Sequence, residues 1–244
     1  MTSDSIEATE RLAALRDAIG RAARLTDRTA DDIRLIAISK TQEAAAIRPL
    51  IKAGQRVFGE NRVQEAQAKW PELREEMPDI SLHLVGQLQS NKAADAVALF
   101  DVIHSLDRPS LLTALAKAMD AADRRLPCFI QVNIGAEEQK GGCAIADTPA
   151  LIRAARHADI PVAGLMCVPP ADVEPAPYFA LLAKMARDEG LERLSMGMSG
   201  DFETAIMLGA TDIRVGTALF GERPSAARPV PASGRGMIRN SRAG

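Results

Sequence analysis

Short apolar runs alternate along the 244-residue chain with longer, alanine-rich segments whose apolar residues recur at helical spacing. The apolar runs predict eight strands, over residues 33–39, 56–58, 82–85, 102–104, 128–133, 162–166, 193–196 and 212–215. The segments between them predict helices over residues 43–53, 61–76, 90–99, 109–124, 148–158, 175–189 and 200–208. An amphipathic helix over residues 5–25 precedes the first strand, and Pro71 is expected to interrupt the helix over 61–76.

This alternation is typical of parallel α/β folds. A (β/α)8 TIM barrel usually takes about 250 residues, so the pattern predicts a single-domain barrel over residues 1–223 with an extra N-terminal helix. A doubly wound open sheet is the alternative, because the number of strands does not force the sheet to close. Residues 224–244 are rich in Pro, Ala, Ser, Gly and Arg and lack periodicity, so we expect a disordered C-terminal tail.

Composition excludes several classes of partner. The chain has 30 Lys and Arg against 32 Asp and Glu, a formal net charge of -2, so it offers no strong positive field to nucleic acid or an anionic membrane. Only 3% of residues are aromatic, which disfavours base-stacking platforms. The three cysteines form no CxxC pair, and neither a signal peptide nor a membrane-length apolar run is visible. We therefore expect a soluble, cytoplasmic protein.

Lys40 is the first candidate for chemistry, because it ends the first predicted strand. At the mouth of a barrel, a desolvated lysine amine could attack a carbonyl carbon. The alternative is a lysine at a strand end that extends its ammonium into solvent. Position alone favours the second interpretation.

The ends of the last two strands predict a phosphate site. Gly197, Gly200 and Gly216 would allow the backbone to approach an anion, and Thr217 adds a hydroxyl. Ser199 precedes the helix predicted from residue 200, whose first amides favour negative charge. The alternative is that Ser199 is the N-cap of that helix and that the glycines only form turns.

Arg214 lies between Ile213 and Val215 inside the last strand. A buried guanidinium needs a partner, so a structural carboxylate is the default expectation and a ligand acceptor is the alternative. The histidines have no metal-ligand spacing, so no metal site is expected, and His83 is interpreted as a hydrogen-bonded core residue. Nothing in the sequence marks Cys167 as a nucleophile.

Eight segments together resemble the pyridoxal phosphate homeostasis proteins of the YggS/PROSC type. They are IAISKTQ (36–42), FGENRVQE (58–65), LHLVGQLQSNK (82–92), HSLDR (104–108), QVNIGAEEQKGG (131–142), GLMCVPP (164–170), LSMGMSGDFETAI (194–206) and IRVGTALFGER (213–223). The order is consistent from about residue 12 to 223, which makes the resemblance more specific than any single motif.

The resemblance implies a fold-type III barrel, like the N-terminal domain of alanine racemase, that binds pyridoxal 5′-phosphate (PLP). By residue matching, Lys40 would form the Schiff base and Arg214 would face the pyridine nitrogen. Ser199, Gly216 and Thr217 would bind the phosphate. Asn61 of the GEN motif would line the pocket.

The function implied is non-catalytic: a carrier that buffers PLP and delivers it to PLP-dependent apoenzymes. An arginine stays protonated and cannot give a proton to the ring nitrogen, so the ring would be a weak electron sink. A PLP-dependent amino-acid racemase is the enzyme alternative. A racemase would need a second base from an added domain and a partner subunit, and the chain has no residues left for such a domain. Separately, the protein is expected to be a monomer. A Schiff-base aldolase using Lys40 is a third possibility.

The chain departs from its relatives at one position near the Schiff-base lysine. Relatives often have a second lysine two residues after it, where this chain has Gln42. Lys140 matches a loop lysine linked to a secondary cofactor-binding role in relatives. Here we expect Lys140 to be a solvated loop charge.

Overall fold

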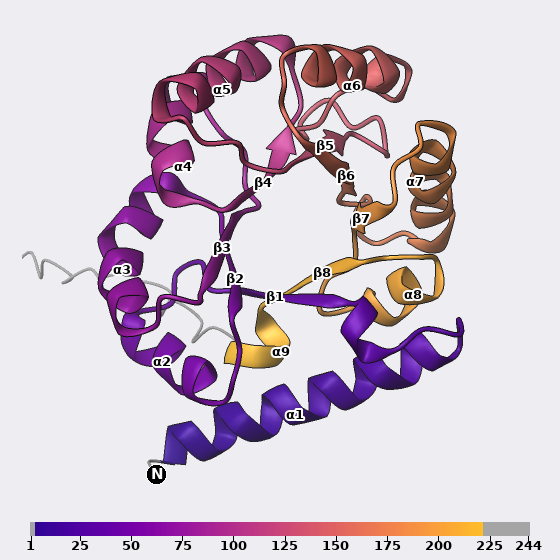
Figure 1. The fold of residues 1–244 in the computed structure, drawn as a ribbon. Coiled ribbons are helices and arrows are strands. Elements are labelled where there is room, and N and C mark those ends of the chain that lie inside the picture. Colours follow the sequence, from indigo (N-terminus) through magenta and orange to yellow (C-terminus); the bar gives the residue numbers. More distant parts are fainter. Residues whose placement is uncertain (1–2, 222–244) are drawn as a thin grey trace, which may run out of the picture.

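The computed structural model describes residues 3–221 and places eight parallel strands in a closed barrel, in the order of the chain (Figure 1). The strands are β1 (Arg34–Ile38), β2 (Val57–Glu60), β3 (Ser81–Leu84), β4 (Val102–Leu106), β5 (Cys128–Val132), β6 (Val162–Cys167), β7 (Arg193–Ser195) and β8 (Asp212–Val215). The barrel closes between β1 and β8, which pair from Arg34 opposite Asp212 to Ala37 opposite Val215. The predicted barrel is confirmed, and the open-sheet alternative is wrong.

Helices surround the barrel (Figure 1). They are α1 (Ser3–Arg24), α2 (Ala44–Lys52), α3 (Val63–Glu76), α4 (Ala93–Leu99), α5 (Pro109–Ala122), α6 (Thr148–His157), α7 (Ala176–Asp188), α8 (Phe202–Met207) and α9 (Thr217–Phe220). Short 3-10 turns, η1 (Ala30–Asp32), η2 (Ser90–Lys92) and η3 (Ile145–Asp147), precede β1, α4 and α6. The predicted tail from residue 224 lies outside the described residues.

Burial explains the sequence pattern. Every residue of β4 and β5 is buried, as expected for parallel strands covered on both faces. Helices of the outer ring bury one apolar stripe; in α5 this stripe includes Leu111, Leu115 and Met119, all fully buried. Helix α1 packs on α2, α8 and α9, beside the seam between β1 and β8 (Figure 1).

Pro71 does not interrupt its helix, so that prediction is wrong. Helix α3 continues from Val63 to Glu76 with Pro71 inside it. A proline removes the hydrogen bond to the carbonyl four residues earlier, here that of Gln67. Both residues are exposed, so water can bind the freed carbonyl while the buried face of α3 stays packed.

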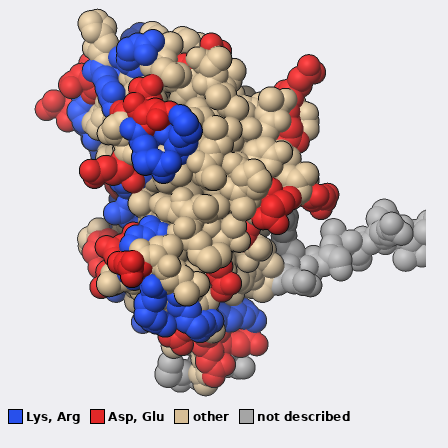
Figure 2. Space-filling model, turned by 90° about the vertical axis from the view of Figure 1, so that its right-hand side faces the viewer, with Lys and Arg blue, Asp and Glu red and all other residues tan. Residues whose placement is uncertain are grey.

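The described surface carries no single basic field on the face seen in Figure 2, where basic side chains lie among acidic ones around a broad uncharged area. Among residues 3–221, no helix combines the length and apolar character needed to cross a membrane.

Candidate functional site

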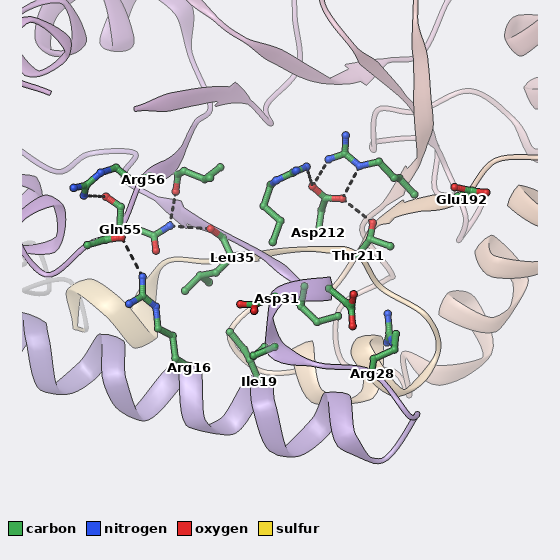
Figure 3. Close-up of a pocket in the computed structure, with 17 residues that line it drawn as sticks. Arg16, Ile19, Arg28, Asp31, Leu35, Gln55, Arg56, Glu192, Thr211 and Asp212 are labelled. Atoms are coloured by element: carbon green, nitrogen blue, oxygen red, sulfur yellow. Dashed lines mark hydrogen bonds and ion pairs between the residues drawn. The ribbon is translucent and has the colours of Figure 1, made fainter. Parts of the chain in front are cut away.

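The two mouths of the barrel differ in what they expose. At the N-terminal ends of the strands, a hollow of about 910 Å³ separates the barrel from α1 (Figure 3). Its buried carboxylate is paired: Asp212, fully buried, contacts Arg34 Nη1 at 3.1 Å and Arg193 Nη2 at 2.6 Å. Thr211 Oγ1 donates to the same carboxylate at 2.7 Å. These contacts hold the bottom of the barrel together.

The opposite mouth, at the C-terminal ends of the strands, is where barrels of this class carry their active sites. A smaller hollow there brings together Lys40, Gly216 and Thr217, with Ile38, Thr41, Gln42, Phe220 and Gly221 completing its lining. Three of the six residues singled out from the sequence therefore surround one hollow, although they come from the two ends of the chain. The C-terminal mouth is therefore the candidate site, although the hollow in it is small.

Strand β1 ends at Ile38 and is followed by the buried Ser39 and then by Lys40, which is exposed. Its Nζ forms no hydrogen bond or ion pair with any residue from 3 to 221. The exposed position is compatible with both expectations for this lysine. Its location beside Gly216 and Thr217 distinguishes it from a lysine on an unrelated part of the surface.

Gly216 and Thr217 connect β8 to α9. Gly216 is the N-cap of α9, whose first residue is Thr217. A Cβ on Gly216 would lie 3.3 Å from the Ile38 carbonyl oxygen and 3.4 Å from Ile38 Cβ. The small residue therefore lets the loop after β8 approach the end of β1, next to Lys40.

Ser199 is not the N-cap of the following helix. Helix α8 begins at Phe202 with Asp201 as its N-cap. The amides of Asp201 and Phe202 both donate to the Met198 carbonyl, at 3.1 and 2.9 Å, which forms a turn before the helix begins. Ser199 lies within this turn and outside the lining of the hollow around Lys40.

Asn61 follows β2 and also lies outside that lining. Its backbone packs against Gly86, in the loop after β3: a Cβ on Gly86 would lie 2.7 Å from Asn61 Cα and would overlap its carbonyl oxygen. The position of the GEN loop therefore depends on a glycine in the next loop.

Arg214 has no carboxylate partner among the described residues, so the default expectation for it is wrong. Nη1 donates to Ser195 Oγ at 2.7 Å and Nη2 donates to the Cys167 carbonyl at 2.8 Å. Burial lowers the pKa of Arg214 and raises that of the Cys167 thiol to about 12, so Cys167 is no thiolate nucleophile at neutral pH. A guanidinium has five N–H donors, and the others have no partner in the described chain.

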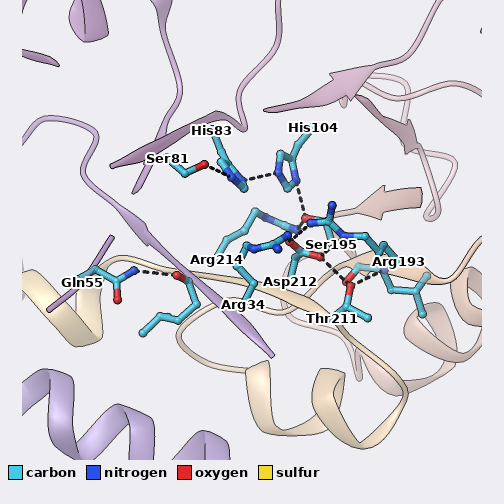
Figure 4. A network of polar contacts seen from close by, with 12 residues as sticks. Arg34, Gln55, Ser81, His83, His104, Arg193, Ser195, Thr211, Asp212 and Arg214 are labelled. Atoms are coloured by element: carbon cyan, nitrogen blue, oxygen red, sulfur yellow. Dashed lines mark hydrogen bonds and ion pairs between the residues drawn. The ribbon is translucent and has the colours of Figure 1, made fainter. Parts of the chain in front are cut away.

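A chain of hydrogen bonds runs from Arg214 through the barrel interior (Figure 4). Ser195 Oγ lies 2.8 Å from His104 Nδ1, His104 Nε2 lies 3.0 Å from His83 Nδ1, and His83 Nε2 lies 3.1 Å from Ser81 Oγ. Because Arg214 can only donate, Ser195 Oγ accepts from it and can donate its own proton to His104 Nδ1. In this direction, His104 Nε2–H donates to His83 Nδ1 and His83 Nε2–H donates to Ser81 Oγ. Each neutral histidine therefore carries its proton on Nε2. His83 is a hydrogen-bonded core residue, as predicted.

The two buried histidines, His83 and His104, are held neutral by their surroundings. Burial, opposed by the charge of Asp212, lowers the pKa of His83 from 6.5 to about 3. Burial also lowers the pKa of His104 well below its usual value, and the positive Arg214 acts in the same direction. Because His104 stays neutral, it adds no second positive charge to that of Arg214.

Comparison with known proteins gives the family. Residues 11–224 match the family described as alanine racemase, N-terminal domain. The pyridoxal phosphate homeostasis protein of Pseudomonas aeruginosa is 40% identical over 220 residues, which covers 88% of this chain and 95% of that protein. The protein of the same description from Escherichia coli strain K12 is 39% identical over 224 residues, covering 87% and 95%. This chain belongs to the pyridoxal phosphate homeostasis protein family.

Solved structures agree with this membership. PipY of Synechococcus elongatus, in a structure described as having PLP bound, is 39% identical with a TM-score of 0.78, covering 88% of this chain and 100% of that one. Alanine racemase from Corynebacterium glutamicum is 18% identical with a TM-score of 0.65, covering 90% of this chain and 62% of that one. The second likeness concerns the fold alone.

Sequence reasoning missed several polar residues close to the site. Lys69 is not singled out by the sequence analysis, yet only 10% of its side chain is exposed and it contacts the Lys40 loop. A signal was present, because Glu65 and Lys69 have the spacing of an ion pair on one helix face. Lys140 is not simply solvated, since it pairs with Glu137 at 2.6 Å and donates to the Pro169 carbonyl at 3.0 Å.

Proposed function

We propose that this protein binds pyridoxal 5′-phosphate at the C-terminal mouth of its barrel, in a Schiff base with Lys40, and serves intracellular PLP homeostasis by buffering and delivering the cofactor. The observation that carries the proposal is the hollow in which Lys40 lies beside Gly216 and Thr217. Family membership and the PLP-bound PipY structure support it.

The donor groups fit this cofactor. Lys40 offers an exposed amine for the aldehyde, and Thr217 with the backbone after Gly216 offers donors to the phosphate. Arg214 keeps N–H donors without a described partner and suits the pyridine nitrogen as acceptor. Asn61 and Ser199, on the loops after β2 and β7, would border the cofactor. When bound, PLP would supply a reactive aldehyde and a ring that withdraws electrons.

The environment of Arg214 supports a carrier over a catalyst. Arginine holds its proton too tightly to transfer it to the ring nitrogen, and its neighbours Ser195 and His104 are neutral. The ring would remain a weak electron sink, which disfavours carbanion chemistry. We also propose that the protein acts as a monomer.

The first test is addition of PLP to the purified protein, followed by borohydride reduction and peptide mapping. We expect a Schiff-base absorption band and a reduced adduct on Lys40. In Lys40→Ala, the band and the adduct should both disappear, because Lys40 carries the only side-chain amine among the described residues that line the hollow. Lys52→Ala, an exposed lysine at the end of α2, should behave like the wild type.

Adducts spread over surface lysines, or a persistent specific band in Lys40→Ala, would contradict the assignment. The racemase alternative has a separate test: incubation of the loaded protein with alanine in deuterated water. We expect no exchange of the α-hydrogen and we expect transfer of PLP to an added PLP-dependent apoenzyme. Rapid exchange would replace the carrier proposal by the racemase.

A further inference from the structure

Lys69, on the inner side of α3, has its ammonium group surrounded by oxygens. Nζ lies 2.8 Å from the Ser39 carbonyl, 3.0 Å from the Gln42 carbonyl, 2.8 Å from Glu60 Oε1 and 3.2 Å from Glu65 Oε1. An ammonium has three donors for these four acceptors. Lys69 is therefore fully committed to local contacts.

The two carbonyls that Lys69 holds belong to the residues on either side of Lys40 and Thr41. The Gln42 amide also donates to the Ser39 carbonyl at 3.0 Å, which closes a turn around Lys40. Lys69 thus binds both ends of the short segment that carries the proposed Schiff-base lysine.

Thr41, in the middle of this segment, has a positive φ of 64°. A β-branched residue seldom adopts the left-handed region, and such a conformation persists only where its surroundings impose it. The Glu65 carboxylate, one helical turn before Lys69, accepts the hydrogen bond of the Thr41 amide. The same carboxylate contacts Lys69, so helix α3 fixes the strained residue directly after Lys40.

Glu60 completes the cluster from the end of β2. Its side chain is fully buried, and Oε1 accepts hydrogen bonds from Ser39 Oγ at 2.6 Å and Trp70 Nε1 at 3.0 Å. Oε2 has no partner among the described residues. Removing the Lys69 ammonium would leave this buried carboxylate without its counter-charge.

We infer that Lys69 is a positioning residue: with Glu60 and Glu65 it fixes the turn of residues 39–42 and so the direction in which the Lys40 amine enters the hollow. The inference rests on the proposed function. In that function the Lys40 amine attacks the aldehyde carbon, a C=N bond replaces the C=O bond and one water leaves; hydrolysis reverses the step. Lys69 takes no part in these bonds and acts only through the backbone of Lys40.

The test is the second-order rate constant for adduct formation between full-length protein, freed of cofactor, and PLP, followed by rapid-mixing absorbance. Lys69→Met and Glu65→Ala should each lower it about 10- to 100-fold, the usual cost of a misplaced reacting group. Glu65→Gln, which keeps an oxygen for the Thr41 amide, should stay within about threefold of the wild type. The matched control is Lys184→Met, which removes the lysine of another helical ion pair, with Asp188 on α7.

Unfolding by urea, measured on the same variants, separates positioning from stability. Wild-type rates in folded Lys69→Met or Glu65→Ala would overturn the inference, as would equal losses in Glu65→Ala and Glu65→Gln. If Lys69→Met does not fold, the two Glu65 variants decide, because Glu65 is partly exposed. A wild type that forms no adduct on Lys40 would instead refute the proposed function.

Discussion

At the scale of single residues, the barrel interior is specified by partnered polar groups. Asp212 is fully buried between two arginines, and Arg214 is buried against a hydroxyl and a carbonyl. Leaving a buried polar group without its partner costs more than the paired interaction contributes. These residues therefore fix one arrangement of side chains beneath the candidate site.

The buried histidines give the protein a pH-dependent stability. Native His83, with a pKa of about 3 against an ordinary 6.5, stays neutral where the unfolded chain takes up a proton. Stability is then independent of this group above pH 6.5 and falls as pH drops toward 3, by about 1.4 kcal/mol per pH unit. His83→Gln should reduce the slope of unfolding free energy against pH between 6 and 4, measured in urea.

The control for this prediction is His157→Gln. His157 is exposed at the end of α6, so the variant should keep the wild-type slope. An unchanged slope in His83→Gln would show that other groups dominate acid unfolding.

At the scale of elements, the site is built from loops that follow different strands and touch one another. Gly216 after β8 lies against the end of β1, and Gly86 after β3 lies against Asn61 after β2. The sequence indicated turns at these glycines. It did not indicate which loop each glycine would approach, because that depends on the closure and register of the barrel.

Gly86→Ala tests the contact between loops. The added methyl group would overlap Asn61 and push the GEN loop away, at an overpacking cost of about 1–3 kcal/mol. We expect the displaced loop to weaken binding. The affinity for PLP should drop about tenfold for each 1.4 kcal/mol of binding free energy that is lost. Equilibrium titration of the absorbance band measures the affinity. The control is Gly20→Ala in α1, where an added Cβ meets its nearest atom at 3.5 Å. This variant should bind PLP with wild-type affinity.

Wild-type affinity in Gly86→Ala, with unchanged stability, would mean that the loops separate without consequence for the ligand. The prediction would then be wrong.

At the scale of the whole molecule, the extra helix α1 packs on helices that follow the first strand and on helices that flank the last strand. It packs on α2, α8 and α9, the helix that begins at Thr217 (Figure 1). Its inner face is buried through Leu12, Leu15 and Ile19. The helix therefore supports the helices on either side of the seam where the first and last strands meet.

Leu12→Ala should lower the free energy of unfolding by about 2–5 kcal/mol, because it removes a side chain that is 1% exposed and leaves a cavity. Denaturation in urea measures this loss. Ile6→Ala, on the same helix but 47% exposed, should change stability by no more than about 0.5–1 kcal/mol. Equal effects of the two substitutions would contradict the packing of α1 described here.

The sequence alone determined the succession of elements and the general place of the chemistry. Hydrophobic periodicity is a local property, so eight strands, the helices between them and the extra N-terminal helix could be predicted to within a few residues, whereas the short α9 (Thr217–Phe220) was missed. Lys40, Ser199, Arg214, Gly216 and Thr217 could be chosen because each lies in a predicted strand or shortly after one, and the resemblance supplied Asn61 and the cofactor.

Tertiary structure decided what those residues touch. It closed the barrel, brought Lys40 beside Gly216 and Thr217, gave Arg214 a hydroxyl and a carbonyl in place of a carboxylate, and moved the helix cap from Ser199 to Asp201. It also turned Lys69 inward, onto the loop of Lys40. The physical reason is that hydrogen-bond partners are chosen by which strand ends meet, and that depends on chain segments far apart in sequence.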